Sequence, residues 1–190
     1  MQMNLPNFLT WLRIVAIPLF VGIFYLPTDW APPATQNLAA TIVFAGAALT
    51  DWLDGYLARV LNQTSAFGAF LDPVADKLMV AAALIVLVHL DRLDAPIALI
   101  IIGREITISA LREWMAQIGK SRSVAVSFLG KIKTAAQMVA IPLLLYHGQV
   151  SDMFDAQVAG TWLIYVAAVL TLWSMIYYLR AAMPHVIHDR

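Results

Sequence analysis

Apolar residues gather into six long segments along the chain, and polar residues collect between them. Each segment is close to or longer than the roughly 20 residues that a helix needs to cross a bilayer. The fifth and sixth segments are the clearest, with uncharged runs at 134–151 and 156–179. The pattern predicts an all-α integral membrane bundle of six transmembrane helices, at 7–26, 35–60, 72–90, 95–117, 126–147 and 156–182.

Charged residues interrupt two of these segments and gather toward one end of each. A charged side chain within a bilayer is costly, so such residues usually line a polar cavity. We therefore expect the third and fourth helices to start or finish at one. The intruding residues are Asp72, Asp76, Lys77, Arg104, Glu105 and Arg112.

The composition agrees with a membrane protein of one domain, spanning 1–190. Hydrophobic residues make up 61% of the chain and charged residues 13%, and the mean hydropathy is +0.76. The formal net charge is zero, so charge does not indicate a nucleic-acid partner. Without cysteine the chain has no disulfides, thiolate ligands or cysteine nucleophile. The N-terminus lacks a basic region and a cleavage site, so we expect no removable signal peptide.

The basic residues lie on one side of the predicted bundle. The connections at 27–36, 89–96 and 147–157 hold five acids and one basic residue, Arg92, whereas the other eleven of the twelve basic residues fall on the opposite side. By the positive-inside rule, both termini face the cytoplasm, and so do Asp51, Asp54, Asp72 and Asp76. This asymmetry argues against a soluble helical protein with an apolar core.

Four aspartates recur at fixed intervals around the second and third segments: Asp51, Asp54, Asp72 and Asp76. On a helix, the first two lie about 60° apart and the last two about 40° apart, so each pair shares a face. A helix hairpin would bring the pairs together, with Pro73 in the first turn of the third helix. A helix cap is the simpler explanation for one such acid, for example Asp72, but it does not account for four.

Four neighbouring carboxylates repel one another unless cations lie between them. Oxygen-only ligands suit hard cations such as Mg²⁺ or Mn²⁺, and a cluster of this size can hold two ions. The sequence therefore predicts a divalent-metal site at the cytoplasmic face.

The pattern D-x-x-D-G-x-x-A-R-x8-G-x3-D-x3-D, from Asp51 to Asp76, resembles the signature of the CDP-alcohol phosphatidyltransferases, and all eight fixed positions match. The resemblance implies a six-helix enzyme of the bacterial inner membrane, with its active site facing the cytoplasm, that forms a homodimer. It also implies roles for the motif residues. Asp51, Asp54, Asp72 and Asp76 would bind metal, Asp76 would act as the base, and Gly55, Arg59 and Gly68 would border the cytidine-diphosphate pocket.

Asn7, Thr10 and Arg13 recur every three residues and therefore line one strip of the first helix. They could reach the nucleotide side of the cavity and bind the CDP-lipid. The simpler alternative is an N-cap at Asn7 and a headgroup anchor at Arg13.

The stretches I-I-G-R-E-I-T-I-S-A-L-R-E-W-M and S-V-A-V-S-F-L-G-K-I-K-T-A-A-Q-M resemble the family member that uses sn-glycerol 3-phosphate. This implies transfer of a phosphatidyl group from CDP-diacylglycerol to that acceptor, with release of CMP. A dianionic acceptor beside carboxylates needs cationic partners. The candidates are Arg104, Arg112, Lys131 and Lys133; the two lysines diverge by about 200° on a helix, so we expect only one to face the cavity.

Two alternatives remain at this stage. The first keeps the chemistry and changes the acceptor to serine or an inositol phosphate. The second is a divalent-cation carrier, although transport sites normally lie near the bilayer midplane rather than beside a basic face. Arg104 could also simply pair with an acid such as Glu105.

Overall fold

The computed structural model describes residues 5–60, 66–119, 128–151 and 154–187. Within these ranges the chain forms six helices and one short hairpin, which confirms the all-α prediction. The elements are α1 (Leu5–Ile23), α2 (Pro33–Val60), α3 (Ala66–His89), α4 (Ala95–Gln117), α5 (Phe128–Tyr146), β1 (Gln149–Ser151), β2 (Phe154–Asp155) and α6 (Ala156–Ile187).

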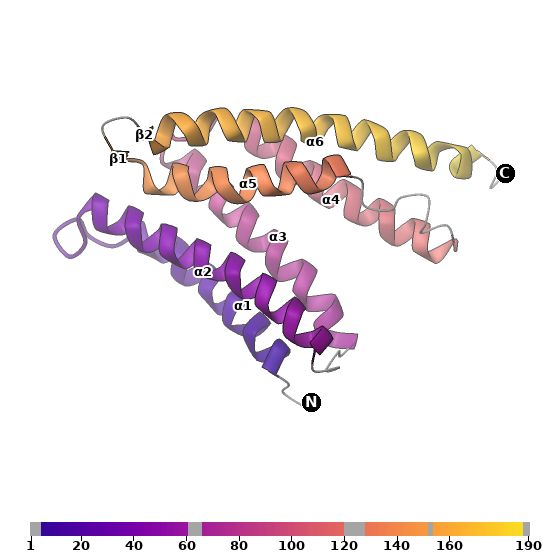
Figure 1. Cartoon of the computed structure of the whole chain (residues 1–190), viewed down its shortest axis with the longest axis horizontal. Helices are drawn as coiled ribbons and strands as arrows, with labels where there is room; N and C mark the ends of the chain where they lie inside the picture. Colours follow the sequence, from indigo (N-terminus) through magenta and orange to yellow (C-terminus); the bar gives the residue numbers. More distant parts are fainter. Residues whose placement is uncertain (1–4, 61–65, 120–127, 152–153, 188–190) are drawn as a thin grey trace.

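The helices form two groups that converge at one end and diverge at the other (Figure 1). Helices α5 and α6 run side by side with α4 behind them, whereas α1, α2 and α3 descend obliquely. The hairpin and the α1–α2 connection lie near the convergent end, and both termini lie toward the open end. Contacts of α2 with α5 and of α3 with α4 join the groups.

The largest differences from the sequence-based bounds are at the start of α3 and at the end of α6, which continues to Ile187 and does not end at 182. Helix α3 begins at Ala66, so Pro73 lies inside it rather than in its first turn, and Asp72 is not a cap. A proline removes only one helical hydrogen bond, and the apolar residues before it sustain two further turns. The predicted loop at 147–157 contains the antiparallel pair β1–β2. These strands are too short for an alternating pattern to reveal them.

The main core lies where the two groups of helices meet. Phe20 and Phe44 of the oblique group pack in the same buried cluster as Leu144 and Ile164 of α5 and α6. Helices α5 and α6 approach closely at Gly160, where an added Cβ would lie 2.9 Å from Cγ of Leu144. Small residues permit such contacts between membrane helices.

Large apolar side chains also cover the outside of the bundle. Leu99 and Trp162 are each about 70% exposed, as expected of residues that contact lipid rather than water. Within the described residues, one helical stretch, Ala156–Met183, is long and apolar enough to cross a membrane. Phe8–Ile23 and Ile132–Tyr146 are shorter apolar helical stretches.

Arg92 ties three helices together at the convergent end. Asp91 adopts a left-handed conformation with φ 55°, and the Arg92 N–H donates to the Leu87 carbonyl at 2.9 Å, so α3 ends in a Schellman motif. The Arg92 guanidinium donates to the carbonyl of Leu145 and to Asn37 Oδ1, each at 2.8 Å. A cation there also complements the dipole of α5.

We expect Arg92→Met to lower the free energy of unfolding by about 2–3 kcal/mol, because it leaves a helix-end carbonyl and the buried Asn37 amide without their donor. Thermal unfolding in detergent would measure the change. Arg180→Met is the matched control, because Arg180 is exposed on α6. Equal losses in the two variants would contradict the role given to Arg92.

Candidate active site

Two side chains of helix α1 each contact an acidic residue, one on α2 and one on α3. Arg13, which is only 2% exposed, forms an ion pair with Asp51 of α2, with 2.6 Å between Nη1 and Oδ1. Thr10, one turn earlier, donates its hydroxyl hydrogen to Oδ1 of Asp72 on α3. The predicted strip of α1 therefore contacts the predicted metal ligands.

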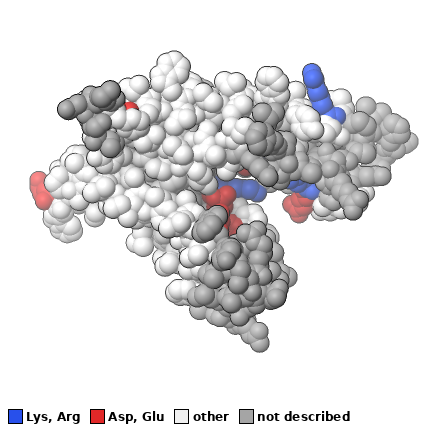
Figure 2. Space-filling model, viewed as in Figure 1, with Lys and Arg blue, Asp and Glu red and all other residues white. Residues whose placement is uncertain are grey.

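Asp76 lies between the carboxylates that contact α1 and the charged cluster around Glu105. One small cavity, of about 10 Å³, is bordered by Asp76 and Arg13. A second, of about 60 Å³, is bordered by Asp76, Glu105 and Gln137. Figure 2 shows acidic and basic side chains meeting in a hollow near the centre of the displayed face, while most of the described surface around it is uncharged.

Two of the predicted acceptor-binding residues donate hydrogen bonds to Glu105. Lys133 of α5 donates to its Oε1 atom, and Nη1 of Arg104 donates to the same oxygen at 3.0 Å. The pairing of Arg104 with its neighbour, raised as an alternative from the sequence, therefore occurs. Lys133 and Arg104 are both buried, so neither is a surface anchor in contact with water.

Arg104 and Arg112 converge on Tyr178 of α6. Their guanidinium carbons lie 5.6 and 5.2 Å from the centre of its ring, within the range of a cation–π interaction. Nη2 of Arg112 also donates to the Tyr178 hydroxyl at 3.3 Å, and Nη2 of Arg104 donates to Ser174 Oγ at 3.2 Å. Two cations thus contact the Glu105 carboxylate, and Arg112 joins Arg104 at Tyr178, which leaves the cluster net positive and suited to an anion.

Sequence reasoning did not assign Glu105, Gln137, Ser174 or Tyr178 to the site. Glu105 carried a signal, because it is one of the charges that interrupt the fourth segment. Ser174 and Tyr178 lie inside an uncharged apolar run, where periodicity does not distinguish a site-lining residue from a packing one.

Several predicted site residues fall outside the described side chains. Gly68 is described and is buried on α3. The structure does not describe the side chains of Asn7 on α1, Asp54 and Arg59 on α2 or Lys131 on α5, nor the surroundings of Gly55 on α2.

The donor set of the described acids fits a hard divalent cation. Within the described residues, the contacts of Asp51 and Asp72 with helix α1 use Oδ1, which leaves Oδ2 of each for a cation. No group of three or more metal-ligating side chains is found among the described residues. The predicted set also requires Asp54, whose side chain is not described.

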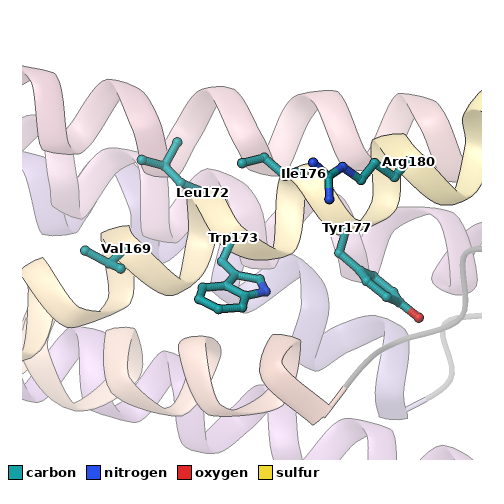
Figure 3. Close-up of a pocket in the computed structure, with 6 residues that line it drawn as sticks. All are labelled: Val169, Leu172, Trp173, Ile176, Tyr177 and Arg180. Atoms are coloured by element: carbon teal, nitrogen blue, oxygen red, sulfur yellow. The ribbon is translucent and has the colours of Figure 1, made fainter.

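A larger cavity lies away from these charges, on α6. It has a volume of about 470 Å³ and its described lining comes entirely from α6 (Figure 3). The lining is mostly apolar, with an arginine at its C-terminal end: Val169, Leu172, Trp173, Ile176, Tyr177 and Arg180. Its described lining contains no carboxylate and no acid–base pair suited to catalysis, so we place the candidate site at Asp76.

Comparisons with known proteins agree with this geometry. The CDP-diacylglycerol–glycerol-3-phosphate 3-phosphatidyltransferase of Escherichia coli (strain K12) is 52% identical over 185 residues, which cover 96% of each chain. Proteins of the same name from Shigella sonnei (strain Ss046) and Shigella flexneri serotype 5b (strain 8401) show the same identity and coverage. The sequence model of the CDP-alcohol phosphatidyltransferases matches residues 3–173. The chain therefore belongs to the CDP-alcohol phosphatidyltransferase family.

Proposed function

We propose that this protein transfers a phosphatidyl group from CDP-diacylglycerol to sn-glycerol 3-phosphate, giving phosphatidylglycerophosphate and CMP. The observation that carries the proposal is the position of Asp76, between carboxylates on α2 and α3 and a net positive cluster on α4 and α5. The family and the names of the relatives support the same reaction.

Asp76 takes the proton from the attacking hydroxyl of the acceptor. The hydroxyl oxygen then forms a bond to the phosphorus of the phosphatidyl group, and the bond from that phosphorus to the CMP oxygen breaks. Two Mg²⁺ or Mn²⁺ ions, bound by Asp51, Asp54, Asp72 and Asp76, would supply positive charge to the diphosphate. Arg13 and Thr10 orient Asp51 and Asp72 through their direct contacts.

The acceptor phosphate binds at the cluster of Arg104, Arg112 and Lys133. Arginine can donate two parallel hydrogen bonds to a phosphate, and lysine adds a point charge. Tyr178 holds both guanidinium groups on one side of α6, which reduces the conformational entropy lost on binding. Of the two lysines that the sequence offers, we assign this role to Lys133 and not to Lys131, because helical positions two residues apart are separated by about 200°.

The CDP-lipid binds on the opposite side of Asp76. Its diphosphate and cytidine would lie near Thr10, Arg13 and Gly68. The other candidates for binding the CDP-lipid are Asn7, Gly55 and Arg59. The lipid tails would enter between helices from the cytoplasmic leaflet. In this arrangement all six helices cross the bacterial inner membrane and both termini face the cytoplasm, in agreement with the distribution of basic residues. A homodimer would fit the family.

CMP release by the purified protein tests the reaction and its dependence on metal. We expect release only when CDP-diacylglycerol, sn-glycerol 3-phosphate and Mg²⁺ or Mn²⁺ are all present. A chelator should reduce the rate to background, and excess metal should restore it, because the carboxylates cannot neutralise the diphosphate themselves. CMP release only with serine or an inositol phosphate would contradict the proposed acceptor. Full activity in the presence of the chelator would contradict the proposed need for metal.

A further inference from the structure

A buried hydrogen-bond donor borders the cavity beside Asp76, and the proposed reaction gives it no role. Gln137 of α5 is 4% exposed, and its amide Nε2 has no hydrogen-bond partner among the described residues. Leaving a buried donor unpaired costs about 1–3 kcal/mol. An orphaned amide that borders a cavity is therefore available to a ligand.

The cavity is large enough for the part of an acceptor that reacts. Its volume of about 60 Å³ exceeds the roughly 10–15 Å³ that one water molecule requires, so a hydroxyl group and the carbon that carries it fit this space.

The groups that border the cavity also suit a hydroxyl. Asp76, Lys77 and Glu105 border it, and Glu105 already accepts hydrogen bonds from Lys133 and Arg104, so the carboxylate of Asp76 is the acceptor left for a ligand there. A hydroxyl is suited to this lining, because it can donate to a carboxylate and accept from an amide. Thr134 also borders the cavity, but it donates its hydroxyl hydrogen to the Gly130 carbonyl. The Gln137 amide remains as the neutral donor.

We propose that Gln137 is a specificity-determining residue that donates a hydrogen bond to the non-reacting secondary hydroxyl of the acceptor. This inference rests on the proposed function, which places the attacking hydroxyl at Asp76. In sn-glycerol 3-phosphate the secondary hydroxyl is on the neighbouring carbon, so it reaches the same cavity. The phosphate then lies beyond Glu105, at Lys133 and Arg104.

The test compares sn-glycerol 3-phosphate with 3-hydroxypropyl phosphate, which lacks only the secondary hydroxyl, in the parent protein and in Gln137→Leu. We expect the parent to prefer glycerol phosphate by about 10- to 100-fold in kcat/KM. The variant should lose this preference to within about threefold, while KM for CDP-diacylglycerol stays within about twofold. A purely structural role for Gln137 would lower both rates and preserve the ratio.

Gln36→Leu is the matched control, because Gln36 is also buried but donates to the carbonyls of Leu26 and Ala31. It should lower stability and preserve the acceptor preference. Equal kcat/KM values for the two acceptors in the parent would overturn the proposal without any variant, as would a preference retained in Gln137→Leu. If the parent released no CMP with either acceptor, the proposed function itself would fail, and this inference with it.

Discussion

Asp76→Asn is expected to lower CMP formation by about 10²- to 10⁴-fold, the usual contribution of a general base. Asparagine has nearly the same shape, but its amide cannot take a proton from the acceptor hydroxyl at neutral pH. The substitution also removes one negative charge from the predicted metal-binding set. CMP release under saturating CDP-diacylglycerol would measure the loss.

Asp91→Asn is a matched control for this result. Asp91 is exposed and has φ 55°, a conformation that asparagine adopts readily, so activity should remain within about twofold. Thermal unfolding of both variants would separate lost chemistry from lost structure. If Asp76→Asn kept a tenth or more of the parent rate while folded, another group would have to be the base.

Lys133→Met is expected to lower kcat/KM for sn-glycerol 3-phosphate by about 10- to 100-fold. A charge-assisted hydrogen bond to a phosphate contributes about 1.5–3 kcal/mol, and each 1.4 kcal/mol is a factor of ten. The loss should appear mainly in KM for the acceptor, and KM for CDP-diacylglycerol should change little. Initial rates over a range of both substrates would separate the two constants.

Lys131→Met is the comparison for this variant, because helical positions two residues apart are separated by about 200° and we expect only one of them to face the cavity. We expect the fold-loss of kcat/KM for sn-glycerol 3-phosphate in Lys131→Met to be less than a tenth of the loss in Lys133→Met. Since Lys133→Met also leaves Glu105 with one cation fewer, stability has to be tested separately. Glu105→Gln combined with Lys133→Met should recover stability and not activity. Equal losses at positions 131 and 133 would contradict the assignment of Lys133.

The six helices could be predicted from the sequence because their signal is local. Long apolar runs, broken by proline and polar residues, identified the fourth helix at its observed bounds, 95–117, and most other helix ends to within a few residues. The prediction failed at the start of α3, because proline there was interpreted as a first-turn residue. The helix continues on the N-terminal side of Pro73, but nothing in the composition of that stretch reveals the helical hydrogen bonds that form there.

The candidate site was only partly predictable. The aspartate spacing identified Asp51, Asp72 and Asp76, because a fixed interval on a helix places carboxylates on one face. The roles predicted for them remain to be tested, as do those of Asn7, Asp54, Gly55, Arg59 and Lys131, whose side chains lie outside the description. The choice between the two lysines could not be made from the sequence, because helical geometry says that they diverge but not which one faces inward.

The sequence by itself determined the class of the protein: helical and strongly apolar, with carboxylates at a recognisable spacing. These properties depend on composition and on intervals of a few residues. Only the tertiary structure decided which partners those residues meet. Lys133 and Glu105 are 28 positions apart, and Arg112 and Tyr178 are 66 apart. Such contacts depend on how α4, α5 and α6 pack, and no local pattern along the chain records that packing.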